Sequence, residues 1–344
     1  MSNSFTVGLT RDFLDEEGNL TYRDIGLDVL DASGLGYGFL ERNTPLIRSD
    51  QLEGINGVIS LTPDYTPESF TDSDDLVAIA RFGVGYDNVD VAACTQSDIA
   101  LFIASGAVNY SVAEAVVGWM LALNHHVFVK DRLTRTGGWD ERSQYMGTEL
   151  RDRTLGIIGV GGIGQTLVRL VSGFRMKEVL GFDPYLDAGR AKEIGVRLVD
   201  LNTLLKESDF VSVNCPLTDG TRDLIGASEL ELMKSTAYLI NTARGGIVNE
   251  QSLVAALEGR SIAGAAMDVF VEEPAAGEHP LCKLDNVILA PHSIAWTDEI
   301  FRDIGRMNCQ QMVALSEGRM PDGLVNVEVA ERPGFQKKLA RYAS

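Results

Sequence analysis

Residues 154–290 alternate short apolar runs with amphipathic stretches, and this alternation restricts the fold more than any other feature of the chain. The apolar runs are rich in β-branched residues and have the length of buried strands, while the intervening stretches have a helical periodicity. Parallel strands joined by helices need a sheet that is covered on both faces. We therefore predict a doubly wound α/β domain, with strands near 155–159, 179–182, 210–214, 237–241, 263–267 and 286–290 and helices near 163–173, 187–194, 201–206, 228–234 and 250–258.

The first hundred residues have a looser α/β rhythm, and the pattern changes after them. Strands are predicted at 5–10, 57–61, 76–80 and 99–103. Ser111-Val-Ala-Glu114 fits a capping box, which predicts that a helix begins there. The run that follows, to Leu123, is apolar on most of its circumference, so the core or a second subunit must cover it on more than one side. We expect a domain boundary just before this helix.

Composition excludes several classes of protein. The chain has 344 residues, enough for two domains, and its 30 Lys and Arg stand against 49 Asp and Glu, a net charge of −19. A surface this acidic repels phosphate backbones and anionic lipids, so neither nucleic acid nor a membrane is an expected partner. The N-terminus lacks the regions of a signal peptide, and the sequence predicts a soluble, cytoplasmic protein. No CxxC pair occurs among the four cysteines, so no metal site or disulfide framework is expected.

A glycine-rich turn follows the first strand of the predicted doubly wound domain. Gly159-Val-Gly161-Gly162-Ile163-Gly164 fits G-x-G-x-x-G and opens an amphipathic helix. The glycines permit a tight turn, close approach of a pyrophosphate and close helix–strand packing, and the helix amides attract the anion. The next strand ends in Asp183, whose carboxylate can accept both adenosine-ribose hydroxyls and would repel a 2′-phosphate. This context favours NAD over NADP, although Asp183 could instead cap a turn before Pro184.

Three further polar residues stand at successive strand ends. Arg244, Glu273 and His292 each follow one of the last apolar runs. Taken singly, they could be a surface ion pair, a loop carboxylate and a cap. Because the carboxyl ends of parallel strands meet at one edge of the sheet, we expect the three side chains to converge on one crevice.

Taken in order, these motifs resemble the D-isomer-specific 2-hydroxyacid dehydrogenase family. The resemblance extends from about residue 80 to residue 292, with looser similarity in the first 75 residues and the last 40 or so. The matching segments are Arg81-Phe-Gly83-Val-Gly85-Tyr-Asp-Asn-Val-Asp90, Ser111-Val-Ala-Glu114, Leu155-Gly-Ile-Ile-Gly-Val-Gly-Gly-Ile-Gly164, Asn214-Cys-Pro-Leu-Thr218, Ile240-Asn-Thr-Ala-Arg-Gly-Gly-Ile-Val248, Asp268-Val-Phe270, Glu273-Pro274 and Pro291-His292.

The resemblance implies a catalytic role for Arg244, Glu273 and His292. Arg244 would bind and polarise the substrate with its planar fork. His292 would act as the acid–base, and Glu273 would orient the imidazole and favour its protonated form. Glu273 fits better than Glu272 because it directly precedes Pro274. The substrate carboxylate would meet backbone amides of the turn Gly83-Val84-Gly85.

The family pattern also assigns the cofactor contacts, for which NAD is the expected cofactor. Gly159, Gly161, Gly162, Ile163 and Gly164 would surround the pyrophosphate, and Asp183 the adenosine ribose; Cys215, Thr242 and Ala243 would lie along the nicotinamide ribose, and Asp268 would bind the carboxamide. No base partner accompanies Cys215 in the sequence, which argues against a nucleophilic cysteine.

The family architecture implies a discontinuous domain arrangement. Residues 1–105 and 295–344 would form a flavodoxin-like α/β substrate-binding domain, and 106–294 the Rossmann domain for NAD. Dimerisation through the helix that begins near Ser111 is the family habit, so a homodimer is expected.

Two departures from the pattern bear on the substrate. Ile59-Ser-Leu61-Thr-Pro63 carries no arginine where phosphoglycerate dehydrogenases hold a phosphate, which argues for a small, unphosphorylated D-2-hydroxy or 2-oxo acid, similar to glyoxylate or hydroxypyruvate. Trp296 replaces a small residue after His292 and would line the substrate pocket, or else pack at the hinge or a dimer contact. The alternatives are a non-catalytic NAD(H) sensor similar to the C-terminal-binding corepressors, and phosphoglycerate dehydrogenase. A formate-type enzyme would have Gln at position 273.

Overall fold

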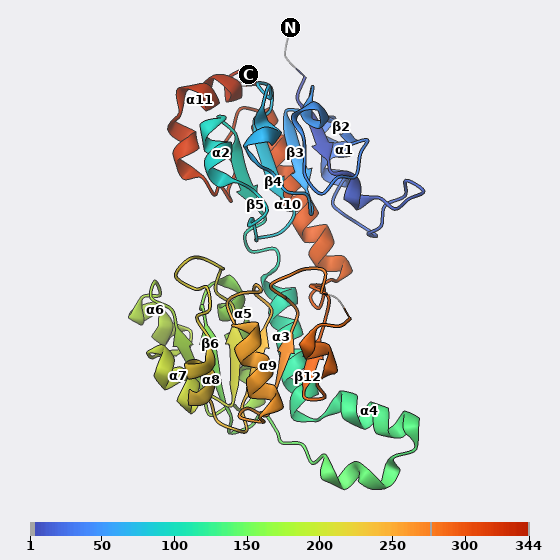
Figure 1. The fold of residues 1–344 in the computed structure, drawn as a ribbon. Helices are drawn as coiled ribbons and strands as arrows, with labels where there is room; N and C mark the ends of the chain where they lie inside the picture. The colour runs from blue at the N-terminus through green and yellow to red at the C-terminus, as the bar shows by residue number, and fades with distance from the viewer. Residues whose placement is uncertain (1–3, 276, 343–344) are drawn as a thin grey trace. The chain divides into compact units, whose positions relative to one another are not determined.

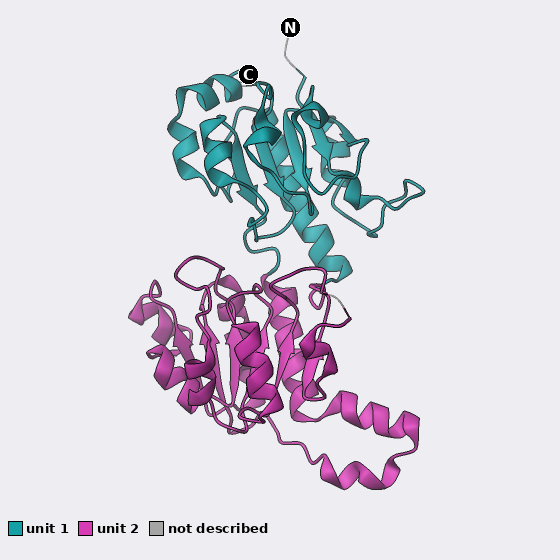
Figure 2. Cartoon of the chain, in the orientation of Figure 1, with its two compact units in different colours: residues 1–108, 296–344 teal, residues 109–295 magenta. Residues whose placement is uncertain are grey.

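In the computed structural model the chain forms two compact units, one of them discontinuous (Figures 1 and 2). Unit 1 comprises residues 1–108 and 296–344, and unit 2 comprises residues 109–295; the sequence placed these divisions after residues 105 and 294. The structure describes residues 4–275 and 277–342. Residues 1–3, which belong to the N-terminal segment without the features of a signal peptide, lie outside the described residues.

Unit 2 is built on a seven-stranded parallel sheet, which confirms the predicted doubly wound α/β class. The strand order is β12-β11-β10-β9-β6-β7-β8, so the order reverses between the neighbours β6 and β9. All of its strand pairs are parallel. The strands are β6 (Thr154–Ile158), β7 (Glu178–Phe182), β8 (Arg197–Leu198), β9 (Phe210–Val213), β10 (Tyr238–Asn241), β11 (Gly264–Met267) and β12 (Val287–Leu289).

Helices cover both faces of this sheet (Figure 1). One hydrophobic cluster joins the sheet to α7 (Leu201–Glu207), α8 (Ala227–Leu232) and α9 (Glu250–Glu258). The other cluster lies on the side of α3 (Asn109–Asn124), α5 (Gly162–Val171) and α6 (Ala188–Glu193). In α5 the buried residues include Gly164, Leu167, Val168 and Val171, an i, i+3, i+4, i+7 stripe that packs on the sheet.

The predicted capping box at Ser111-Glu114 is wrong. Helix α3 begins at Asn109, so Ser111 is its third residue. An N-cap residue must have a non-helical backbone, which a residue inside the first turn does not have. The buried residues of α3 include Ala113, Val116 and Leu123, which lie on one side of the helix. The rest of its apolar surface therefore points away from this core.

Helix α3 continues into an extension that sequence periodicity did not indicate. Helix α4 (Val127–Thr136) has no buried residue, and a 3-10 helix, η4 (Trp139–Gln144), follows it. Figure 1 shows both projecting from the α/β body of unit 2. In the described part of the chain no single helix is long and apolar enough to span a membrane; α3 and α4 reach that length only as a pair bent by 55°.

Unit 1 has a five-stranded parallel sheet in the order β2-β1-β3-β4-β5, the order of flavodoxin-like folds. Its strands are β1 (Thr6–Leu9), β2 (Gly36–Phe39), β3 (Gly57–Ser60), β4 (Ala78–Arg81) and β5 (Ala100–Ile103). Its helices are α1 (Asp28–Ser33), α2 (Val91–Gln96), α10 (Asp298–Ser316) and α11 (Pro333–Leu339), with short 3-10 helices η1 (Arg11–Phe13), η2 (Ser49–Leu52), η3 (Pro67–Phe70) and η7 (Val327–Glu331). The long helix α10 therefore returns the chain to the first domain, against β3, β4 and β5.

Candidate active site

The glycine turn lies at the reversal of strand order in unit 2. Gly159 follows β6 with a φ of 87°, and a Cβ atom there would be 2.7 Å from the backbone nitrogen of Cys215, which follows β9. A Cβ atom on Gly164 would be 2.7 Å from the carbonyl oxygen of Gly159. Only glycine fits at both positions, and ligands of such sheets bind at this reversal.

The N-terminus of α5 is open to an anion. Gly161 is the N-cap, and a glycine has no side chain that could accept a hydrogen bond from the first turn of the helix. A Cβ atom built on Gly161 would meet nothing within 4 Å, so free space lies above the turn. Unpaired amides and the helix dipole at such a position suit a pyrophosphate.

Asp183 is fixed against this turn. One oxygen of its carboxylate accepts the Val160 amide at 2.9 Å, and the other accepts the Tyr185 amide at 2.9 Å. The residue therefore caps its own turn and also contacts the glycine loop. Each carboxylate oxygen can accept a second hydrogen bond, so the predicted ribose contact is compatible with both amides.

Two buried polar atoms near the ends of β9 and β10 have no partner within residues 4–275 and 277–342. They are the hydroxyl oxygen of Thr242 and the side-chain oxygen of Asn214. Buried polar groups are nearly always hydrogen-bonded, so these two atoms are available to hydrogen-bond a ligand. Together with the open glycine turn, they show that the residues of unit 2 fit a dinucleotide. The neighbouring Cys215 thiol is mostly buried, which raises its pKa to about 11 and keeps it protonated at neutral pH.

The structure brings His292 and Glu273 together. Nδ1 of His292 lies 2.7 Å from the Glu273 carboxylate. A carboxylate only accepts, so this contact places a proton on Nδ1 and leaves Nε2 to face other groups. The His292 side chain is 45% exposed, which leaves Nε2 within reach of a ligand.

The charge of Glu273 is stabilised from several directions. Burial raises the pKa of this carboxyl, but hydrogen bonds from His292 and from the Phe270 amide, with the positive charges of His292 and Arg244, outweigh burial and lower the pKa overall. The Phe270 amide donates at 2.9 Å. Glu273 is therefore ionised beside the imidazole, and Arg244 is close enough to act on it electrostatically.

Asp268 fixes the segment that carries His292. The His292 amide donates to the Asp268 carbonyl at 2.7 Å, and the carboxylate accepts the amides of Ser293 and Ile294 at 2.8 and 3.1 Å. Burial raises the pKa of Asp268, while the two amides lower it in part. Both amides donate to the same oxygen, Oδ1, which is thus committed to this backbone.

Arg244 follows β10 in a turn that Asn241 organises. The buried Asn241 side chain accepts the Ala243 amide and donates to the Arg244 carbonyl, both at 3.0 Å. Arg244 itself donates to the Ala243 carbonyl at 2.7 Å. Asn241 was not predicted as a site residue, because its only signal in the sequence is an asparagine at a strand end before a turn.

In unit 1 the second glycine turn offers two amides. Gly83 has a φ of 141° and its own amide donates to the Arg81 carbonyl at 2.8 Å, so this amide is occupied. The amides of Val84 and Gly85 have no acceptor in the described part of the chain. Consecutive free amides in such a turn suit a carboxylate.

Trp296 also belongs to unit 1 and lies among aromatic rings. It meets Tyr22 and Phe301 edge-to-face, with ring centroids 5.7 and 5.2 Å apart. Its side chain is still 53% exposed. Val84, Gly85 and Trp296 are therefore in one unit, and the other predicted site residues are in the second.

The sheet topology and the glycine turn thus place unit 2 in the class of doubly wound dinucleotide-binding domains. Residues 117–293 match the family model of the D-isomer specific 2-hydroxyacid dehydrogenase, NAD binding domain. The chain belongs to this family of NAD-dependent oxidoreductases, as its motifs predicted.

Relatives of two named activities resemble the chain over most of its length. A glyoxylate reductase of Korarchaeum cryptofilum is 37% identical over 293 residues, 83% of this chain and 88% of that protein. A D-3-phosphoglycerate dehydrogenase of Archaeoglobus fulgidus is 36% identical over 323 residues, 94% of this chain but only 60% of that protein. A solved Thermus thermophilus structure is 28% identical, with a TM-score of 0.81, and the match covers 93% of this chain and 100% of that one.

Proposed function

We propose that the protein is an NAD-dependent dehydrogenase of a small, unphosphorylated D-2-hydroxy acid, or a reductase of the matching 2-oxo acid. The observation that carries this proposal is the contact between His292 Nδ1 and the Glu273 carboxylate, 2.7 Å apart in an NAD-binding domain. A proton donor and acceptor of this kind is what interconversion of a hydroxyl and a carbonyl requires. Bound NAD supplies a hydride acceptor, and NADH a hydride donor.

His292 is the proposed acid–base. Its Nδ1 is occupied by Glu273, so Nε2 takes the proton of the substrate hydroxyl during oxidation and returns it during reduction. Glu273 fixes the tautomer and stabilises the imidazolium that forms. This role needs an ionised glutamate, in agreement with the lowered pKa of Glu273.

Arg244 and the glycine turn of unit 1 are the proposed anchors of the substrate. The guanidinium of Arg244 binds the substrate carboxylate or polarises the oxygen on C2. The amides of Val84 and Gly85 would bind the carboxylate as well. Trp296 would shape the space for the remainder of the substrate.

The remaining residues are assigned to the cofactor. Gly159, Gly161, Gly162, Ile163 and Gly164 hold the pyrophosphate, Asp183 holds the adenosine ribose, and Cys215, Thr242, Ala243 and Asp268 lie on the nicotinamide side. The orphaned hydroxyl of Thr242 supports this assignment.

An unphosphorylated substrate is favoured by the end of β3. Leu61 follows this strand and is buried, and residues 59–63 include no lysine or arginine, so this segment itself offers no cation to a phosphate. Glyoxylate reductases among the relatives agree with a small 2-oxo acid, and phosphoglycerate dehydrogenases among them make a phosphorylated one the alternative.

Oxidation of NADH, followed at 340 nm with a panel of 2-oxo acids, tests the proposal. The panel contains glyoxylate, hydroxypyruvate, pyruvate, longer 2-oxo acids and phosphohydroxypyruvate, each also with NADPH. We expect turnover with a small unphosphorylated acid and NADH. Preference for phosphohydroxypyruvate would identify a phosphoglycerate dehydrogenase, and NADH binding without turnover of any acid would identify a sensor.

The variant H292Q tests the assigned acid–base. We expect kcat to fall by roughly 10²- to 10⁴-fold while the fluorescence enhancement of bound NADH persists. A kcat close to that of the wild type would remove His292 from the chemistry.

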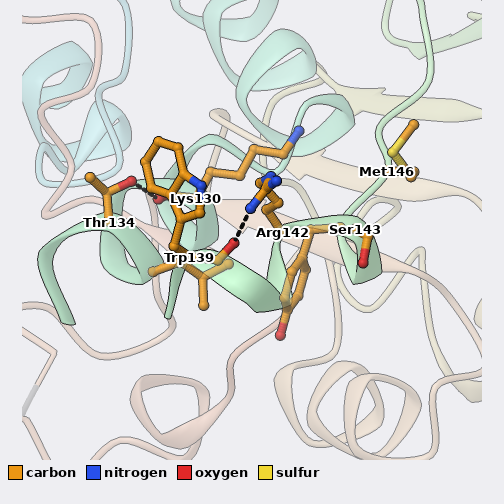
Figure 3. Close-up of a pocket in the computed structure, with 8 residues that line it drawn as sticks. Lys130, Thr134, Trp139, Arg142, Ser143 and Met146 are labelled. Atoms are coloured by element: carbon orange, nitrogen blue, oxygen red, sulfur yellow. Dashed lines mark hydrogen bonds between the residues drawn. The ribbon is translucent and has the colours of Figure 1, made fainter. Parts of the chain in front are cut away.

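We also propose a homodimer that covers the outer surface of α3 and the α4–η4 extension. A groove of about 500 Å³ lies in this extension, and Leu133 is among the residues that line it. Figure 3 shows Trp139, Arg142 and Met146 around this groove. Trp139 and Met146 are 62% and 77% exposed. Exposed apolar groups of this size, continuous with a helix whose outer face is apolar, fit a second copy of the chain.

Sedimentation velocity of wild type and W139A measures this association. We expect the wild type to be a dimer. W139A should form a weaker dimer, which is already dissociated at protein concentrations at which the wild type is still dimeric. The matched control is Y185A, because Tyr185 is 95% exposed and lies outside the extension. A monomeric wild type would contradict the dimer.

A further inference from the structure

A second carboxylate–imidazole pair lies beside the first in unit 2. Glu250 is the first residue of α9, and His279 is the N-cap of the 3-10 helix η6 (Pro280–Lys283). His279 Nε2 is 3.2 Å from the Glu250 carboxylate, and the two side chains are only 18% and 17% exposed. The proposed reaction uses neither residue.

The hydrogen bonds of this pair define its protonation. His279 Nδ1 accepts the Leu281 amide at 3.3 Å, so this nitrogen carries no proton. Nε2 therefore carries the proton and donates it to Glu250. The Glu250 carboxylate sits in the first turn of α9, where the helix dipole favours a negative charge.

Both members of the pair contact the loop that leads to Glu273. The other oxygen of Glu250 accepts the Val271 amide at 2.6 Å. The His279 ring meets the Phe270 ring edge-to-face at 5.4 Å. The Phe270 amide in turn donates to Glu273. Glu250 therefore holds the backbone at Val271, His279 packs on the Phe270 ring, and the backbone of Phe270 holds Glu273.

The opposite side of this backbone has no room to shift. A Cβ atom built on Gly245 would lie 1.9 Å from the Phe270 carbonyl oxygen, so the loop rests directly on the turn that follows Arg244. Phe270 and Val271 are therefore clamped between that turn and Glu250. A displacement of Val271 would move the amide that Glu273 accepts.

We propose that Glu250 and His279 are a positioning pair, which holds Phe270 and Val271 so that the Glu273 carboxylate keeps its orientation toward His292. This inference rests on the proposed function of Glu273 and His292. A hydrogen bond from a neutral imidazole adds only modestly to stability, because in the unfolded chain both groups bond to water instead. The directional hydrogen bonds of the pair, in contrast, fix orientation, and misplacement of a reacting group by about 1 Å can cost two orders of magnitude in rate.

The kinetic test compares E250A, E250Q and H279F with E273Q and the wild type. E250A removes both contacts, while E250Q keeps an oxygen that can accept the Val271 amide. H279F removes the hydrogen bond to Glu250 and keeps a ring against Phe270. Glu278, 93% exposed beside this region, provides the matched control E278Q.

We expect E250A to lower kcat roughly ten- to hundredfold with little change in KM for NADH, and to displace the pH–rate profile in the same direction as E273Q. E250Q should recover most of the loss, H279F should show a smaller change of the same kind, and E278Q should match the wild type. An unchanged kcat and pH profile in E250A, with only the melting temperature lowered, would overturn the proposal. If E250A does not fold, an unchanged kcat and pH–rate profile in H279F would overturn the proposal.

A measurement without substrate separates this inference from the proposed function. The chain has four histidines, so the titration curve of the His292 Cε1 proton can be assigned by NMR with H292Q and H279F. We expect the curve of E250A to move from the wild-type curve toward that of E273Q. An unmoved curve overturns the positioning pair; a moved curve in a protein that reduces no 2-oxo acid overturns the proposed function instead.

Discussion

His292 donates its backbone amide to the carbonyl of Asp268 at 2.7 Å, while its own φ is 51°. The left-handed region is rarely populated by residues other than glycine, so this conformation needs support from its surroundings. Asp268 gives that support, because its carboxylate also accepts the amides of Ser293 and Ile294. The imidazole is thereby presented from a backbone that one aspartate holds.

D268N tests the cost of the buried charge at this position. Burial raises the pKa of Asp268, so the folded protein favours the protonated carboxyl and loses stability as the pH rises through the folded-state pKa. The side-chain oxygen of asparagine can accept both amides without a charge. We expect D268N to be at least as stable as the wild type at neutral pH, with the difference vanishing in acid, in thermal denaturation across this range.

D268A is the control for the hydrogen bonds, since it removes the acceptor altogether. It should be less stable than D268N by about 1–3 kcal/mol, because the amides of Ser293 and Ile294 lose their partner. A D268N protein that melts well below the wild type at neutral pH would contradict the expectation.

E273Q should change the pH dependence of stability in the sense opposite to D268N, because folding lowers the pKa of Glu273 but raises that of Asp268. The pKa of Glu273 is lowered on folding, so its contribution is fully present above the ordinary value of 4.5 and is lost as the pH falls through the folded-state pKa. We expect the wild type to be more stable than E273Q above about pH 5, and the gap to narrow in more acidic solution. Urea denaturation at several pH values measures the gap.

The matched control for this series is E272Q. Glu272 is exposed and adjacent in sequence, and the structure pairs Glu273, not Glu272, with His292. If the difference in stability between wild type and E273Q did not depend on pH, the charge of Glu273 would not contribute to its contact with His292.

The sequence sufficed for the doubly wound sheet of unit 2 because its strands are nearly continuous apolar runs and its turns carry glycine. It did not predict β2 and β8. β2 is Gly36-Tyr-Gly-Phe39, half of it glycine, and β8 has two residues at a sheet edge. β2 alternates glycine with Tyr37 and Phe39 over only four residues, and β8 is two residues long, so neither pattern is long enough to predict a strand.

The candidate site was predictable where it depended on strand ends. Topology brings the ends of parallel strands to one edge, which is why Glu273 and His292 could be expected to meet although 19 residues separate them. The Glu250–His279 pair had no such signal, because one residue starts a helix and the other caps a 3-10 turn. The capping box at Ser111 failed for a related reason: a four-residue motif does not determine which turn of a helix comes first.

Asp183 provides a test of cofactor selection. Its carboxylate contacts the glycine turn through Val160, and its negative charge would repel a 2′-phosphate. We expect D183A to raise KM for NADH roughly tenfold or more and to shift the ratio of kcat/KM for NADH and NADPH toward NADPH. Steady-state kinetics with both cofactors measure this ratio.

D183N separates charge from geometry, because asparagine keeps one oxygen that can accept the Val160 amide. If charge repulsion sets the preference, D183N should lose it nearly as fully as D183A. Retention of the NADH preference in D183N would show that the shape of the loop sets it instead.

Trp296 provides the test of substrate selection. More than half of its side chain is exposed, and Tyr22 and Phe301 hold the ring edge-to-face, so it is an apolar surface of fixed orientation. We expect W296A to change the ratio of kcat/KM for glyoxylate and for longer 2-oxo acids by roughly tenfold. Y22A should change the ratio in the same direction by a smaller factor, since it removes one of the rings that fix Trp296. V327A, at another exposed apolar residue of the same unit, should leave the ratio unchanged. If W296A keeps the wild-type ratio, Trp296 only packs against its neighbours and does not contact the substrate.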